Sequence, residues 1–327
     1  MANNKKKKKK KSYVNWRFVI IMSVILSVAA IITMADFLSL PSFIPTWEDV
    51  GNTLDDIKDD IAGDYNIPSL KNDKELAVHY IDVGQGDSAL IQYDGKNALV
   101  DSGDVSATDD IISYLNSHSI SRIDLLIVSH PDSDHIGAMS KVVDNFDIGE
   151  IYMPPLSDDL VPTTNVYTNL LLSISRKGLK ITLAEAGDTI PFGDLALRCV
   201  APQGEFASTN NSSIAFKLEY GETSFLFTGD MEKESERSTM QKKYDVSADV
   251  LKVAHHGSKS STTEDFLEAV SPRIAVISVG EDNRYKHPSE SVLEALSERG
   301  IEIYRTDLDG DIVIISDGKE LSVTKQK

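Results

Sequence analysis

The amino-acid sequence predicts an α/β protein in which two β-sheets pack face to face with helices outside, preceded by one transmembrane helix. Three observations support this fold class. Short strand-like apolar runs alternate with single helical segments from about residue 74 onward. The two halves of that region each read as strands followed by β-α units. Ligand-type side chains follow several of the strands, and open α/β sheets build their sites at that edge.

Residues 1–35 predict a membrane anchor. A run of seven lysines precedes an uncharged apolar run over residues 18–35. A run of this length can cross a bilayer as a helix. The lysines predict a basic cytoplasmic tail over residues 1–17, so that the rest of a single-pass cell-membrane protein is extracellular. The alternative is a signal peptide cleaved near Ala35, which would give a secreted protein.

Charge is distributed unevenly along the chain. The chain has 33 Lys and Arg residues and 51 Asp and Glu residues, a net charge of −18. Eight of the basic residues and no acidic residue lie in residues 1–35, which leaves 25 basic against 51 acidic residues and a net charge of −26 for the remainder. An acidic domain does not attract nucleic acid through bulk electrostatics. Cys199 is the only cysteine, which excludes an intramolecular disulfide.

Residues 36–73 contain prolines and many acids and are predicted to form an acidic linker or stalk, and residues 74–327 form the folded domain. Apolar, β-branched runs predict strands at 75–83, 89–93, 97–101, 123–128, 150–153, 179–183, 195–200, 213–220, 223–227, 250–254, 273–278, 301–304 and 311–315. Helical periodicity predicts helices at 107–116, 136–146, 165–177, 232–241, 263–270 and 289–299. Asp94-Gly95 is a hairpin signal, and Gly178 is a helix stop.

One loop contains four possible metal ligands within six positions. His130, Asp132, Asp134 and His135 follow the buried strand 123–128 and precede a helical segment. A strand-to-helix turn of this kind lets the side chains converge at the end of the strand. Imidazole and carboxylate donors at this density are typical of a divalent metal centre.

Other predicted strand ends carry the same residue types. Asp101, Asp230, the pair His255 and His256, and His287 all lie beside Gly, Ser or Pro in loops. Such donors can hold two divalent cations with one bridging carboxylate, and the metal pair activates a water. The high share of carboxylates makes Zn²⁺ and Mn²⁺ the expected ions, with one or two bound.

These motifs resemble the metallo-β-lactamase superfamily over about residues 76–316. The usual loop is His-x-His-x-Asp-His, and Asp132 stands in place of the second histidine. This departure, with the segments 80–88, 210–213 and 252–258, resembles the ComEC-like branch, whose best-known member carries this domain beside a DNA-uptake channel. The resemblance implies an αββα sandwich and a metal-dependent hydrolase.

The resemblance also implies roles for single residues. It assigns metal ligation to His130 and Asp132 for one ion, to Asp134, His135 and either His255 or His256 for the other, and to Asp230 as the bridge. Asp134 and His287 are the expected catalytic residues, with His287 protonating the leaving oxygen; a plain surface histidine is the alternative. Asp101 is expected to orient a ligand. Asn210 and Ser213 stand where a third-motif histidine is usual, so one metal site is expected to be weak or empty.

Three functions from different classes follow. The first is an anchored, outward-facing phosphodiesterase or nuclease related to DNA uptake, for which Lys252, Lys259, Arg284 and Lys286 would supply a local basic path. The second is a hydrolase of a small or cell-envelope ester, lactone or phosphodiester, for which an acidic surface is no obstacle. The third is a non-catalytic anchored receptor. The expected partners are the membrane and DNA, and the sequence leaves the oligomeric state open.

Overall fold

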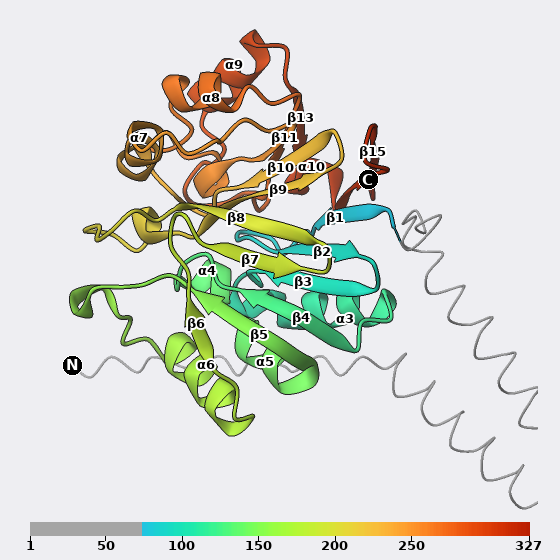
Figure 1. Ribbon diagram of the computed structural model, residues 1–327, viewed down its shortest axis with the longest axis vertical. Coiled ribbons are helices and arrows are strands. Elements are labelled where there is room, and N and C mark those ends of the chain that lie inside the picture. The colour runs from blue at the N-terminus through green and yellow to red at the C-terminus, as the bar shows by residue number, and fades with distance from the viewer. Residues whose placement is uncertain (1–73) are drawn as a thin grey trace, which may run out of the picture. The chain divides into compact units, whose positions relative to one another are not determined.

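The computed structural model describes residues 74–327 (Figure 1). The predicted basic tail, anchor and stalk at 1–17, 18–35 and 36–73 lie outside the described residues. Among the residues that are described, none of the helices combines the length and the apolar character that a bilayer span requires.

The first sheet has eight strands in the order β15-β14-β1-β2-β3-β4-β5-β6. The strands β1 to β3 pair antiparallel, and β3 to β6 pair parallel. Their bounds are β1 Leu76–Tyr80, β2 Ala89–Tyr93, β3 Lys96–Val100, β4 Arg122–Ile127, β5 Asp147–Met153, β6 Ile181–Leu183, β14 Ile312–Ser316 and β15 Leu321–Lys325.

The second sheet repeats this arrangement with seven strands in the order β13-β12-β11-β10-β9-β8-β7. Neighbouring strands from β7 through β10 pair antiparallel, and neighbouring strands from β10 through β13 pair parallel. Their bounds are β7 Thr189–Phe192, β8 Leu195–Ala201, β9 Ala215–Tyr220, β10 Thr223–Phe227, β11 Val250–Lys252, β12 Ile274–Ile277 and β13 Glu302–Arg305.

Helices cover the outer face of each sheet (Figure 1). The α-helices are α3 Thr108–Ser117, α4 Ser133–Ile136, α5 Met139–Asn145, α6 Asn165–Arg176, α7 Lys233–Gln241, α8 Glu264–Val270, α9 Glu290–Glu298 and α10 Thr306–Asp309. The 3₁₀ turns are η1 Val105–Ala107, η2 Asp158–Leu160, η3 Asn210–Ser212 and η4 Ala254–Gly257. In the figure α3, α5 and α6 lie along the first sheet, and α7, α8 and α9 lie along the second.

Three layers of apolar side chains hold the structure together. The central layer lies between the sheets and contains Tyr80, Phe216 and Phe225, all fully buried. A second layer packs α3, α5 and α6 on the first sheet, and a third packs α8 and α9 on the second. Burial of apolar surface on both faces of both sheets is the main favourable term in folding. The predicted αββα sandwich is therefore confirmed.

The sequence interpretation differs from the structure at several elements. The predicted helix 136–146 begins only at Met139, as α5, and the short helices α4 and α10 were not predicted. Helix α4 ends before α5 begins because the Gly137 N–H donates to the Gly103 carbonyl at 2.8 Å, where a Cβ on Gly137 would lie 2.2 Å from the Val105 nitrogen. Strand β7 was missed because Pro191 interrupts its pattern, and the sheet tolerates this proline because β7 is an edge strand. Strand β15, a mostly half-exposed edge strand without an apolar run, was also missed.

Candidate metal centre

The predicted ligands come together where parallel strands end. Asp101 follows β3, the His130–His135 loop follows β4, Asp230 follows β10, and His255-His256 follows β11. The backbone N–H of Asp101 donates to the Ile127 carbonyl at 2.9 Å, so the first two of these strand ends are joined directly. Because both sheets contribute, the site lies across the edge of the sandwich.

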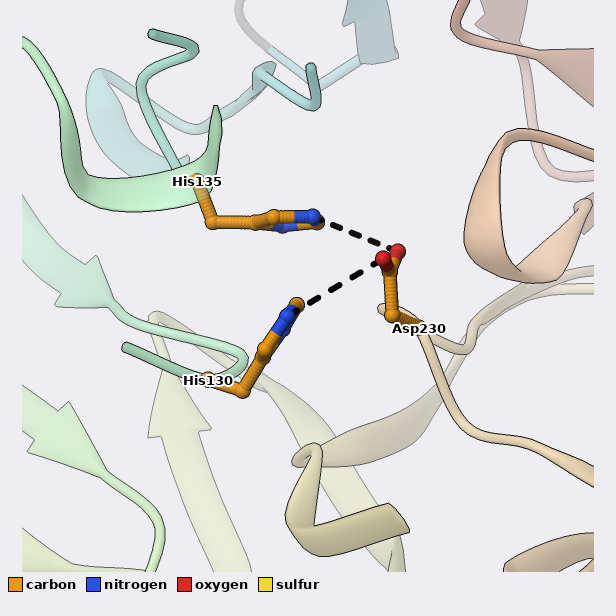
Figure 2. Close-up of side chains that lie close together, drawn as sticks. All are labelled: His130, His135 and Asp230. Atoms are coloured by element: carbon orange, nitrogen blue, oxygen red, sulfur yellow. Dashed lines mark ion pairs between the residues drawn. The ribbon is translucent and has the colours of Figure 1, made fainter. Parts of the chain in front are cut away.

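Asp230 is the central residue of the site and is 3% exposed. Its Oδ1 lies 3.2 Å from the Nε2 of His135. Its Oδ2 lies 3.9 Å from the Nε2 of His130, 3.7 Å from that of His255 and 3.6 Å from that of His256. Figure 2 shows His130 and His135 approaching the carboxylate from the first half of the chain. One buried carboxylate therefore faces four imidazoles, as a bridging ligand would.

Asp101 fixes the orientation of His135. The Nδ1 of His135 donates to Asp101 Oδ2 at 2.8 Å, so Nε2 is left facing Asp230. Asp101 is itself held by the backbone N–H and the hydroxyl of Ser129, at 2.8 and 2.6 Å. A carboxylate behind an imidazole selects the ring tautomer that can bind a metal. This is the orienting position expected for Asp101.

A second buried carboxylate supports His256 in the same way. The Nδ1 of His256 donates to the Ser278 carbonyl at 2.9 Å and lies 3.1 Å from Asp87 Oδ1. The other oxygen of Asp87 pairs with Lys252 Nζ at 2.7 Å. Lys252 is only 4% exposed, so the expected role of this lysine in a basic surface path is wrong. It lies behind the site and neutralises Asp87.

The adjacent histidines have an unusual backbone conformation. His255 and His256 have φ values of 51° and 54° in η4, a left-handed conformation that non-glycine residues seldom adopt. This conformation brings both neighbouring rings to Asp230, with ring centroids 6.1 Å apart. His256 is buried, whereas His255 is partly exposed and also lies 3.4 Å from Glu232 Oε1.

The donor atoms form overlapping groups within metal-binding reach. Among the described residues these groups are His130, His135 and Asp230; Asp134, His135 and His256; Asp87, Asp101 and His135; and Asp87, Asp230 and His256. Asp134 Oδ2 is 3.5 Å from the Nε2 of His256. The Oδ2 of Asp132 is 3.8 Å from the Nε2 of His130, and its side chain is 42% exposed, so Asp132 lies at the open side of the site. Of the two adjacent histidines, His256 is therefore the one that joins Asp134 in a ligand group.

The buried carboxylates of this cluster favour positive charge beside them, as the pKa values of the neighbouring histidines show. Burial opposes protonation of His135, yet the carboxylates of Asp230 and Asp101 hold its pKa well above its ordinary value. Burial also opposes protonation of His256, but the carboxylates of Asp230 and Asp87 raise its pKa to about 10. Burial would raise the pKa of Asp230, and the neighbouring His135 and His256 instead keep it well below its usual range.

The residues fit a divalent metal. Within residues 74–327 no hydrogen-bond partner exists for four buried atoms that face the centre: Nε2 of His130, His135 and His256, and Oδ1 of Asp230. Buried polar atoms without partners are costly and rare in proteins. Imidazole nitrogens and carboxylate oxygens aimed at one point are the donors that Zn²⁺ and Mn²⁺ accept.

The Asn210–Ser213 segment supports the site from behind. The hydroxyl of Ser213 accepts from the backbone N–H of Asp230 at 3.1 Å, and the side chain of Ser213 is fully buried. The amide nitrogen of Asn210 lies 3.5 Å from Nδ1 of His255. Both residues therefore contact ligand-bearing positions.

The remaining predicted site residues lie on the rim. The ring of His287 is 5.7 Å from that of His255, measured between centroids, and is half-buried. Arg284 and Lys286 are exposed on the same loop, and Lys259 is exposed shortly after His256. Sequence reasoning did not single out Tyr285, which stacks on His287 with a centroid distance of 5.8 Å.

The comparisons with known proteins agree with this geometry. A family model described as the metallo-beta-lactamase superfamily matches residues 81–281. The chain is 33% identical over 264 residues to ComE operon protein 3 of Bacillus subtilis, covering 75% of this chain and 33% of that protein. It is 31% identical over 245 residues to competence protein ComA of Neisseria gonorrhoeae, covering 74% and 33%, respectively. It is 32% identical over 248 residues to recombination protein 2 of Haemophilus influenzae, covering 72% and 28%.

The chain thus spans about a third of the length of these curated relatives. In this chain, the family match runs from the end of β1 to the loop after β12 and includes the strand ends that carry the buried ligand cluster. The chain belongs to the metallo-β-lactamase superfamily, in its ComEC-like competence branch of metal-dependent hydrolases.

Proposed function

We propose that this protein is a membrane-anchored, outward-facing, metal-dependent phosphodiesterase that cleaves DNA in connection with DNA uptake. The observation that carries the proposal is the contact of the Asp230 carboxylate with four imidazoles at 3.2 to 3.9 Å. Such a carboxylate suits a pair of cations. The names of the relatives, a competence protein among them, favour DNA as the substrate.

The chain's own residues supply most of the machinery. His130, Asp132, Asp134, His135, His256 and Asp230 would hold the ions, with His255 beside them. Bound Zn²⁺ or Mn²⁺ would lower the pKa of a water and neutralise charge on the attacked phosphate. Asp101 and Asp87 keep His135 and His256 in the tautomer that presents Nε2.

His287 is proposed as the group that protonates the leaving oxygen. Its ring lies beside His255 at the partly open side of the centre, where a leaving strand could depart. Burial, followed by the charges of His255 and His256, lowers its pKa. A lowered pKa makes it a stronger acid once protonated and ties its activity to mildly acidic pH.

The acidic surface opposes DNA binding over most of the domain, so the proposal depends on local charge. Arg284, Lys286 and Lys259 are exposed near the site and form the proposed path for the phosphate backbone. Residues 18–35 are proposed as the anchor. Digestion of intact cells with a protease that cannot cross the membrane tests the orientation, since an outward-facing domain would be removed.

The proposal is tested by measuring metal content and DNA cleavage together on the full-length protein. Asp230→Ala should lose metal and all cleavage, and Asp132→Ala should lose cleavage with part of the metal. Asp159→Ala, an exposed residue of η2 that belongs to none of the ligand groups, is the matched control and should behave as wild type. Metal-loaded protein that leaves single- and double-stranded DNA intact would refute the nuclease proposal.

A second candidate is a hydrolase of a small or cell-envelope ester, lactone or phosphodiester. The acidic surface favours it, because a neutral or cationic substrate meets no repulsion. Turnover of generic ester or aryl phosphodiester probes without DNA cleavage would support this candidate.

A further inference from the structure

A row of aromatic rings leads from the metal centre to the surface. The row begins at His255, whose Nε2 is 3.7 Å from Asp230 Oδ2. His287 follows with its ring at 70° to that of His255 and a centroid distance of 5.7 Å. Tyr285 is the outer member and lies nearly parallel to His287, at 14° and 5.8 Å. The row therefore contains three rings, from His255 at the centre to Tyr285 at the surface.

The outer ring is accessible and is held in place. Tyr285 is 48% exposed, although most large aromatic side chains of the described domain are buried. Asn283 fixes the loop: its amide donates to the Gly280 carbonyl at 3.0 Å and to the His287 carbonyl at 2.6 Å, and its oxygen accepts from the His287 N–H at 2.9 Å. An exposed ring on a loop with this many hydrogen bonds loses little conformational freedom when it binds a ligand.

A cation accompanies the exposed ring. The guanidinium carbon of Arg284 lies 4.7 Å from the centroid of the Tyr285 ring, and the guanidinium also donates to the Tyr285 hydroxyl. Arg284 itself is exposed. The guanidinium lies over one face of the ring, so a base can take that face once Arg284 turns from the ring to the phosphate. An aromatic ring and a cation together are the pair with which proteins bind single-stranded nucleic acid, because the ring stacks on a base and the cation meets the phosphate.

We infer that Tyr285 stacks on an unpaired nucleobase next to the phosphate held at the metal centre, with Arg284 contacting the sugar-phosphate backbone. The inference rests on the proposed function and adds to it a substrate-positioning residue. The base has to be unpaired, because both faces of a base inside a duplex are covered by its neighbours. The row of rings thus selects single strands and frayed ends, and it does so by stacking on any base rather than by reading the sequence.

The test compares two labelled oligonucleotides of equal length on the full-length protein, one with all bases and one abasic at every position. Binding is measured by fluorescence anisotropy in Ca²⁺, and cleavage is measured in Mn²⁺. Wild type should bind the base-containing strand about 5- to 30-fold more tightly than the abasic strand. Tyr285→Ala should remove that preference, and Tyr285→Phe should keep it. The control Leu183→Ala changes a large apolar side chain on β6 that is 60% exposed, and it should keep the preference as well.

The outcomes separate this inference from the proposed function. Base-dependent binding that survives in Tyr285→Ala would overturn the inference even if DNA is cleaved. An equal affinity of wild type for both strands would overturn it too. Base-dependent binding that is lost in Tyr285→Ala, without cleavage of either strand, would support the binding site and reject the nuclease. Unchanged metal content in Tyr285→Ala excludes damage to the centre as the cause.

Discussion

Replacing Lys252 with Met isolates the buried charge pair behind the metal centre. The side chains of Lys252 and Asp87 are 5% and 7% exposed, and Nζ and Oδ2 are 2.7 Å apart. Lys252→Met keeps an unbranched apolar side chain one atom shorter than that of lysine and leaves the Asp87 carboxylate without its cation. Removal of one partner of a buried ion pair costs about 3–5 kcal/mol. Because His256 still lies 3.1 Å from the other oxygen of Asp87, we expect the lower end, about 3 kcal/mol.

The free energy of unfolding is measured in urea with a chelator present, so that metal binding does not contribute. The expected loss corresponds to a fall in Tm of about 6–12 °C for a domain of this size. Lys217→Met is the matched control: its Nζ is also 2.7 Å from a carboxylate, but that carboxylate, Asp245, is 68% exposed and can be hydrated. The double variant Lys252→Met/Asp87→Asn should recover most of the loss, since neither of these two positions then carries a buried charge without its partner.

The stability loss of Lys252→Met should become smaller as the pH falls. Burial would raise the pKa of Asp87, but Lys252 and then His256 hold it below its ordinary value. Wild type therefore keeps the contribution of Asp87 above the unfolded pKa of about 3.9 and loses it as the pH falls further. In Lys252→Met the pKa of Asp87 rises, so acid protonates the carboxylate and the deficit relative to wild type shrinks. A deficit below about 1 kcal/mol at pH 7, or one that grows with falling pH, would refute the reasoning.

Three further predictions concern the centre and its rim. The pKa of His135 lies well above its ordinary value and that of His256 is about 10, so metal loading should displace protons from these rings. Calorimetry in buffers of different ionisation enthalpy should show this proton release, and the metal affinity should rise with pH. His287→Ala should keep the metal content and slow DNA cleavage about 10²- to 10⁴-fold, with a smaller loss for a nitrophenyl leaving group, which needs no protonation. The wild-type rate of cleavage should fall as pH rises, and the variant should lack that dependence. Gly257→Ala should cost about 1–3 kcal/mol of stability in thermal melts, because φ is +80° and a Cβ would lie 2.5 Å from the Cβ of Pro288. Gly178→Ala, where a Cβ meets nothing within 4 Å, should cost less.

Much of the fold was readable because most strands are apolar runs bounded by turn residues. Strand β10 over Thr223–Phe227 has the predicted bounds, and the division into two similar halves follows from the order of the segments. The break between α4 and α5 was not readable. Gly137 continues the helical pattern in sequence and has helical φ and ψ, and the break appears only because its N–H donates to the Gly103 carbonyl at 2.8 Å.

At the site, sequence indicated which residues would gather but not how they are supported. The motif loops supplied the donors around Asp230. The choice between His255 and His256 depends on a left-handed backbone at both positions, which tertiary contacts impose. Lys252 looked like a surface cation because nothing in a single sequence shows that its partner, Asp87, is buried beside it. Tyr285 carries no motif, and an exposed tyrosine cannot be told from a buried one by its neighbours in sequence.

The gathering of donors from both sheets has a mechanical consequence. An ion shared by His130 and Asp230 would close a loop of about 100 residues, and one shared by His135 and His256 a loop of about 120, so each ion would act as a reversible cross-link between the two layers of the sandwich. Closing so long a loop restricts the unfolded chain in the way a disulfide does, and this chain has a single cysteine. Resistance to unfolding would then follow the concentration of free metal. The protein would be most rigid where metal is plentiful and would loosen along this edge where metal is scarce.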